Sequence, residues 1–198
     1  MNLDFYNKSV ELQITKLKEI LISNKKIVFI LHKLQEYNLD SYYLGAGCIS
    51  QTVFNYYHGY DLEKNINDYD IVYFDSDLTY EKEDKIITDI TLLCREINVK
   101  LDIKNQARVH LWSLKTLGRK IKQIYSLEDA VRGWGTTVTC IGVKFKNNDL
   151  EIFAPYGLND LFGLKIVPLK ENIPKEVYLN KTKKWKEKWP LLNIYEWK

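Results

Sequence analysis

The sequence predicts one α/β (α+β) domain in which a mixed sheet is flanked by helices. Strand-like and helix-like segments alternate between residues 42 and 103, which is typical of an α/β core. The chain has 198 residues, a usual length for one domain, and 45% of them are apolar. It contains no internal repeat, low-complexity run or linker, so we expect residues 1–198 to fold as a single unit.

The first forty residues predict two N-terminal helices. One apolar stripe with the helical period is formed by Val10, Ile14, Leu17 and Leu21. Asn24 interrupts this stripe, and a second one runs from Ile27 to Leu34 and ends near Asn38.

Residues 41–165 are expected to form the core of the domain. Strands are expected at 42–44, 68–74 and 99–103, with helices at 49–57 and 79–97 between them. The patterns that follow predict helices at 107–117 and 127–134, and a hairpin of 138–145 with 150–153 that turns at 147–149.

Several classes of protein are excluded by simple features of the chain. Its apolar runs are too short to span a bilayer, so we expect no membrane association. The first residues lack the pattern of a secretory signal. The three cysteines, Cys48, Cys94 and Cys140, form no CxxC pair, so neither a disulfide framework nor a zinc cluster is expected. These features favour a cytoplasmic protein.

The last part of the chain, residues 166–198, is a basic, Trp-rich tail. From Leu164 to Lys198 there are nine Lys and four Glu, so this segment carries +5 and the rest of the chain −2. A helix is expected at 175–188, ended by Pro190. Its Lys side chains could bind a phosphate-rich partner, or its Trp side chains could dock on the body and leave the Lys in solvent.

A glycine-containing turn connects the first predicted strand to the next helix. Gly45, Ala46 and Gly47 form this turn, and Ser50 follows in the helix. Glycines allow backbone N–H groups to approach an anion, and the helix N-terminus adds unpaired donors and a partial positive charge. The turn is therefore a candidate phosphate site, although a tight turn would use glycine in any case.

Two acidic residues lie two positions apart on the second predicted strand. Asp68 and Asp70 would point to one face of the sheet, while Tyr69 and Ile71 point into the core. Two neighbouring carboxylates repel one another unless a cation lies between them. Mg²⁺ prefers such oxygen ligands and is usually completed by substrate phosphates. The alternative is a pair of solvated acids at a strand edge.

A third acid, Asp102, lies between apolar residues on the third predicted strand, where it could come close to the first pair. Together, Asp68, Asp70 and Asp102 would form a metal site opposite a glycine-lined anion site. That arrangement suits phosphoryl or nucleotidyl transfer with two metal ions. Arg108 follows closely and, if the strand continues, could reach a phosphate; an ordinary salt bridge is the alternative.

This order of turn, Asp-x-Asp strand and later Asp strand resembles the DNA-polymerase-beta-type nucleotidyltransferase superfamily. The long gap before Asp68 resembles the head of tRNA CCA-adding enzymes and poly(A) polymerases. Over residues 40–190 the chain resembles small bacterial nucleotidyltransferase-like proteins, in the segments 46–55, 68–75, 104–110 and 154–162. It departs from the superfamily where Ala46-Gly47 replaces the usual Gly-Gly or Gly-Ser, and where Ser50-Gln51 stands in place of Arg-Asp.

The resemblance implies a Mg²⁺-dependent enzyme, with Mn²⁺ as a substitute, whose catalytic and metal-binding residues are Asp68, Asp70 and Asp102. Gly45, Ala46, Gly47, Ser50 and Arg108 would bind the nucleotide. The expected reaction moves a nucleoside monophosphate from an NTP to a hydroxyl of a tRNA, a small molecule or a protein, and releases pyrophosphate. Two alternatives stay open, namely a nucleotide- or RNA-binding protein without turnover and a toxin-like transferase that acts on tRNA or protein.

Overall fold

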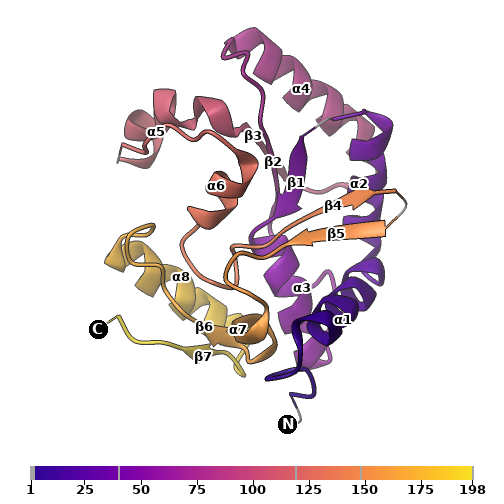
Figure 1. Cartoon of the computed structure of the whole chain (residues 1–198), viewed down its shortest axis with the longest axis vertical. Helices are drawn as coiled ribbons and strands as arrows, with labels where there is room; N and C mark the ends of the chain where they lie inside the picture. The colour runs from indigo at the N-terminus through magenta and orange to yellow at the C-terminus, as the bar shows by residue number, and fades with distance from the viewer. Residues whose placement is uncertain (1–2, 40, 119, 148, 198) are drawn as a thin grey trace.

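The computed structural model describes residues 3–39, 41–118, 120–147 and 149–197. Its central feature is a five-stranded mixed sheet with strand order β3-β2-β1-β4-β5 (Figure 1). The predicted fold class, a mixed sheet flanked by helices, is confirmed. Strands β2 and β3 pair in parallel, and the other pairs are antiparallel. The strands are β1 (Tyr42–Gly45), β2 (Tyr69–Tyr73), β3 (Leu101–Asn105), β4 (Gly142–Lys146) and β5 (Asp149–Phe153).

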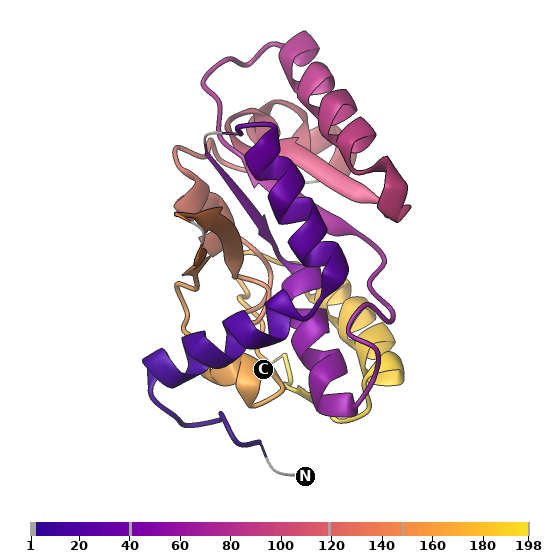
Figure 2. The same cartoon turned by 90° about the vertical axis from the view of Figure 1, so that its right-hand side faces the viewer.

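Four helices cover one face of the sheet and enclose the main core (Figure 2). They are α1 (Val10–Ile22), α2 (Lys25–Glu36), α3 (Gly47–His58) and α4 (Tyr80–Leu93). The first two begin directly after Ser9 and Asn24, whose side chains accept backbone N–H bonds and cap the helices. Gly59 ends α3 in the left-handed conformation with φ of 64°. A short 3-10 turn, Arg95–Ile97, follows α4.

The opposite face of the sheet is covered only in part, by α5 (Val109–Leu117), α6 (Leu127–Arg132) and the loops around them (Figure 1). A second, small apolar cluster lies here, with Tyr43 and Val72 from the sheet against Leu127 and Val131 from α6. Side chains alternate along a strand, so the residues beside Tyr43 and Val72 belong to the main core. The polar positions of this second face are therefore partly open to solvent.

The basic tail folds back onto α3. It contains α8 (Lys175–Lys188), as predicted, and the strand β7 (Asn193–Ile194), which pairs with β6 (Lys165–Ile166) in a small sheet. The short α7 (Asn159–Phe162) comes just before the tail. Trp185 and Trp189 are buried, and both rings contact Phe54 edge-on with centroids 5.8 and 5.7 Å away. The Trp residues thus dock on the body of the domain, as one of the two interpretations of the tail predicts.

Two boundaries differ from the prediction for a local reason, and one predicted turn is not fully described. Strand β3 continues to Asn105, whose side chain accepts a bond from the N–H of Ala107 and starts a 3-10 turn at Gln106–Arg108. Residues 138–141 are not a strand, because Thr136 and Thr139 close a turn through their hydroxyls, 2.8 Å apart. The turn predicted at 147–149 includes residue 148, which lies outside the described residues.

Within the described ranges, none of the helices combines the length and the apolar character that a bilayer span requires.

Candidate active site on the open face of the sheet

Three predicted site residues lie side by side across neighbouring strands. Asp70 on β2 is the direct partner of Asp102 on the parallel strand β3, and of Gly45 on the antiparallel strand β1. Tyr69 and Ile71, the chain neighbours of Asp70, point into the main core. Side chains alternate along a strand, so Asp70 and its partner Asp102 point to the opposite face. The acids and the end of the turn therefore meet on the open face of the sheet.

Asp70 is a half-buried carboxylate without a partner. Its side chain receives no hydrogen bond and forms no ion pair within 4.0 Å in the part of the chain that the structure describes. Burial, reinforced by the carboxylates of Asp68 and Asp102, raises its pKa to about 6, although Lys104 and Lys181 act in the opposite direction. Such an acid disfavours its own charge and would gain from a bound cation.

The two other acids each lie near a lysine. Asp68, directly before β2, has the Lys100 ammonium 4.0 Å away, a loose and exposed contact. Asp102 is bonded to the ammonium of Lys104, two residues further along β3 and therefore on the same face of the sheet. The ammonium of Lys104 thus supplies the positive charge beside Asp102 that a metal ion would otherwise supply.

The donor set fits a divalent ion that binds together with nucleotide. Among the described residues, no group of three or more His, Cys, Asp or Glu is arranged to hold a metal ion as it stands. Mg²⁺ commonly takes only one or two carboxylates and fills its other positions with water and substrate phosphates. The repulsion at Asp70 is the observation that supports this fit.

The turn between β1 and α3 is strained at Ala46. This residue has φ of 56° and ψ of −128°, a conformation that a residue with a Cβ rarely adopts. Such strain costs about 1–3 kcal/mol and is commonly found at functional sites. The turn is held in place by the Ala46 N–H, which donates to the carbonyl of Ile141 at 3.1 Å. No side chain caps the N-terminus of α3, so its first-turn N–H groups have no capping partner, which is the arrangement that binds anions at helix N-termini.

The two glycines of the turn differ in what requires them. A Cβ on Gly45 would lie 2.6 Å from the carbonyl oxygen of Ile141 and 2.7 Å from the ring of Trp134, so packing alone demands glycine there. A Cβ on Gly47 would meet only the flexible end of Gln51, at 3.0 Å. Packing alone therefore does not demand glycine at position 47, where the start of α3 would meet a phosphate.

Two other predicted nucleotide-binding residues make internal contacts. Ser50 is fully buried, and its hydroxyl donates to the carbonyl of Gly47 at 3.2 Å. Arg108 lies just after the end of β3, whereas Asp102 lies near its start. The guanidinium of Arg108 forms a buried ion pair with Glu83 on α4. It also donates to the carbonyl of Leu78 at 3.0 Å. The structure thus places Arg108 in the salt bridge that the sequence left as the alternative, away from the three aspartates.

Sequence reasoning missed two side chains near the acids. Trp134 follows α6 and borders Gly45, and Lys181 on α8 interacts electrostatically with Asp70 and Asp68. Both are distant from the acidic residues along the chain. The signal that could have suggested Lys181 was the lysine-rich composition of the tail, but composition does not single out one lysine.

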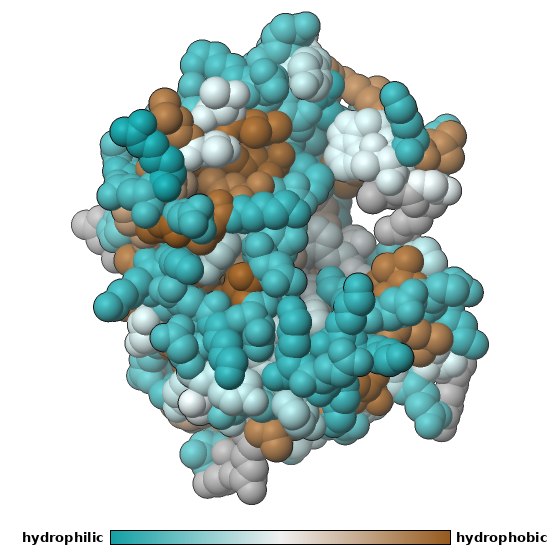
Figure 3. All heavy atoms as spheres, turned by 180° about the vertical axis from the view of Figure 1, so that it is seen from behind, coloured by the Kyte–Doolittle hydropathy of each residue, from teal (hydrophilic) through white to brown (hydrophobic). Residues whose placement is uncertain are grey.

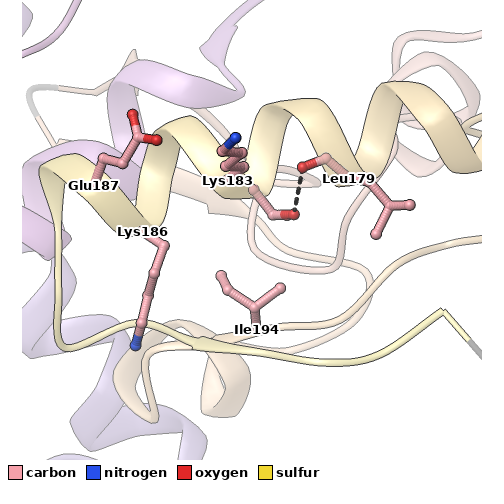
Figure 4. Close-up of a pocket in the computed structure, with 6 residues that line it drawn as sticks. Leu179, Lys183, Lys186, Glu187 and Ile194 are labelled. Atoms are coloured by element: carbon pink, nitrogen blue, oxygen red, sulfur yellow. Dashed lines mark hydrogen bonds between the residues drawn. The ribbon is translucent and has the colours of Figure 1, made fainter.

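The surface is hollowed between the parts formed by α5 and by α8 (Figure 3). A different groove, of about 400 Å³, lies between α8 and β7 (Figure 4). It is lined by Leu179, Thr182, Lys183, Lys186, Glu187 and Ile194. None of the predicted site residues lines this second groove, and the Lys186 ammonium donates to the carbonyls of Pro190 and Leu192. We therefore assign the site by the acids and the turn.

A solved structure defines the class of fold. A protein whose NMR structure is described as revealing a CCA-adding enzyme head domain is similar to this chain, with a TM-score of 0.75 and 21% sequence identity. The match covers 98% of this chain and 100% of the other, so the fold is that of a nucleotidyltransferase head domain.

A sequence comparison gives the family. A family model described as nucleotidyltransferase matches residues 32–194, and the chain therefore belongs to this nucleotidyltransferase family. A search among curated proteins found no significant match.

Proposed function

We propose that the protein transfers a nucleoside monophosphate from an NTP to a hydroxyl acceptor and releases pyrophosphate, with Mg²⁺ or Mn²⁺ as cofactor. Membership of the nucleotidyltransferase family supports nucleotidyl transfer as the class of reaction, with an NTP as substrate. The observation that carries the proposal is the register of Gly45, Asp70 and Asp102 across three neighbouring strands. This register brings acidic side chains to the same end of the sheet as the start of α3.

Each part of the site has a role in this proposal. Asp68, Asp70 and Asp102 would hold the metal ions, with Asp102 released by Lys104 when nucleotide and metal arrive. When bound, the ions would neutralise the phosphates and favour deprotonation of the acceptor hydroxyl. The N–H groups at the start of α3, beside Ala46 and Gly47, would bind phosphate oxygens.

The reaction balances without any further reactant. The acceptor oxygen forms a bond to the α-phosphorus, while the bond from that phosphorus to the bridging oxygen breaks. Pyrophosphate leaves with the bridging oxygen, and the hydroxyl proton passes to a carboxylate of the site or to water. The helix N-terminus and the metal ions offset the charge that accumulates on the leaving group.

A second candidate is a nucleotide-binding protein without turnover. It is favoured by the contact of Lys104 with Asp102, because a lysine that kept this position would exclude a metal ion from the third carboxylate. Binding of an NTP would then occur without transfer.

A labelling experiment distinguishes the two. The protein is incubated with Mg²⁺ and an NTP labelled at the α- or at the γ-phosphate, and with mixed tRNA, small-molecule alcohols or a protein extract as acceptor. Transfer predicts that the α-label enters an acceptor and that the γ-label appears in pyrophosphate, and that Asp70→Asn abolishes both. Bound NTP without label in any acceptor would support the second candidate.

A further inference from the structure

We infer that Lys181 binds the β- and γ-phosphates of the NTP, from α8, on the side of the site opposite the start of α3. This inference rests on the proposed function and deepens it, because it assigns a residue to the leaving group. Nothing in the motifs of the nucleotide-binding turn points to this lysine, which lies more than a hundred residues further along the chain.

The position of Lys181 follows from the way α8 is anchored to α3. The indole Nε1 of Trp189 donates to Asn55 Oδ1 at 2.7 Å, and the backbone N–H of Leu191 donates to the ring of His58 at 3.0 Å. Later residues of one segment thus meet later residues of the other, so α8 runs alongside α3 in the same direction (Figures 1 and 2).

Counting back from this anchor brings Lys181 level with the start of α3. Lys181 lies eight residues before Trp189, and Gly47 lies eight residues before Asn55. At about 1.5 Å per residue, both steps cover about 12 Å along their helices. The ammonium of Lys181 is therefore at the height of the turn that would hold the triphosphate.

The ammonium of Lys181 is free to receive an anion. Lys181 is exposed, and in the described ranges it makes no ion pair within 4.0 Å. Its ammonium lies over the ring of Trp185, 4.9 Å from the centroid, which orients the side chain without neutralising its charge. The next two inward-facing residues of α8, Thr182 and Trp185, are buried, so the helix is held firmly at this point.

The charges of the site reach Lys181 even without a direct contact. Although the residue as a whole is exposed, the protein atoms packed around its ammonium lower the pKa of Lys181, while the carboxylates of Asp70 and Asp68 raise it. In turn, Lys181 lowers the pKa of Asp70. The ammonium of Lys181 thus interacts electrostatically with the two carboxylates but does not form an ion pair with them. A phosphate bound to metal ions on these carboxylates would lie between them and Lys181.

Lys183 provides a matched control. It carries the same charge and lies two residues after Lys181 on the same helix, so it points to another side of α8. There it lines the groove beside β7 (Figure 4). Lys183→Met and Lys181→Met therefore change the net charge equally, and only the second changes the side that faces Asp70.

The test is calorimetric titration of the full chain in Mg²⁺ with an NTP, the matching NMP and inorganic pyrophosphate. Lys181→Met is expected to weaken NTP and pyrophosphate about tenfold to hundredfold, the range of a charge-assisted hydrogen bond, with NMP changed by less than about threefold. Lys183→Met should bind all three as wild type does, and Lys181→Arg should retain most of the affinity. Thermal unfolding should show that all three variants are folded.

Other results would overturn the inference. Wild-type affinity of Lys181→Met for NTP would remove Lys181 from the phosphate site. An equal loss for NMP would place it elsewhere on the nucleotide. Titration of Mg²⁺ alone should show unchanged or tighter binding in Lys181→Met, and a loss there would mean that the effect passes through the metal. A wild type that binds none of the ligands would contradict the proposed function itself.

Discussion

Asp70 and Asp102 are direct partners across the parallel strands β2 and β3, and a lysine accompanies only the second of them. Asp70 has the raised pKa of an acid that lacks a counter-ion, whereas Asp102 is bonded to Lys104. This asymmetry makes Asp70 the residue whose charge destabilises the metal-free protein most directly. It also makes Asp70 the natural first ligand of an incoming cation.

The stability of the metal-free protein should increase when Asp70 is replaced by Asn. The pKa of Asp70 is about 6 in the folded protein against 3.8 for the ordinary group, so the unfolded chain releases this proton first as the pH rises. The native state is therefore destabilised progressively between about pH 4 and pH 6, and the penalty is fully present above that range. We expect the free energy of unfolding of Asp70→Asn to be about 1–3 kcal/mol higher than that of wild type at pH 7.5.

The measurement is urea unfolding in EDTA at pH 4 and at pH 7.5. The two proteins should have similar free energies of unfolding at the lower pH, because the folded protein keeps Asp70 protonated there and most of the penalty develops only above pH 4. Added Mg²⁺ should stabilise wild type more than the variant. A variant that is less stable than wild type at pH 7.5 would show that Asp70 makes favourable contacts instead.

The two glycines of the turn should respond differently to substitution. Gly45→Ala places a Cβ 2.6 Å from Ile141 O and 2.7 Å from Trp134, and we expect a loss of about 1–3 kcal/mol in stability. Gly47→Val should remain folded, because a Cβ at this position meets only the end of the Gln51 side chain. Its bulk should weaken NTP binding much more than binding of the free nucleoside.

Thermal unfolding and calorimetry test these expectations together. Equal loss of NTP and nucleoside in Gly47→Val would indicate a distorted fold and would remove the turn from the phosphate site.

Arg108 should act on stability and leave the nucleotide unaffected. Replacement by Met would leave Glu83 buried without its partner, which costs about 3–5 kcal/mol. Glu83 also accepts the N–H of Asn105 at 2.8 Å, so Glu83→Gln keeps that bond and makes a suitable second substitution. We expect Arg108→Met with Glu83→Gln to recover part of the lost stability, measured by urea unfolding.

Calorimetry on the folded double variant then measures its NTP affinity. A large loss of affinity in a variant of restored stability would mean that Arg108 reaches a phosphate after all.

Much of the fold is visible in the sequence because it depends on local patterns. The helical periods of α1 and α2, the glycine at the end of α3 and the lysine-rich α8 all lie close to their predicted positions. The adjacency of Asp70 and Asp102 also followed from strand order, because two consecutive strands of an α/β core usually pair.

The features that complete the site depend on contacts between distant segments. Trp134 reaches Gly45 through the packing of α6 on the sheet, and Lys181 reaches the acids because Trp189 fixes α8 on Asn55. The position of the Arg108 side chain depends on one local feature, because the side chain of Asn105 ends β3 before Arg108 is reached. The periodicity of side chains could not show that feature.

Metal-dependent nucleotide binding tests the central claim most directly. The NTP is titrated calorimetrically into wild type and Asp70→Asn, each with Mg²⁺ and with EDTA, after unfolding measurements have shown that the variant is folded. We expect wild type to bind the NTP in Mg²⁺, and its affinity to fall at least about tenfold in EDTA or on substitution of Asp70, since either change removes a charge-assisted contact. Equal NTP affinity for both proteins, with or without Mg²⁺, would contradict a metal site at Asp70.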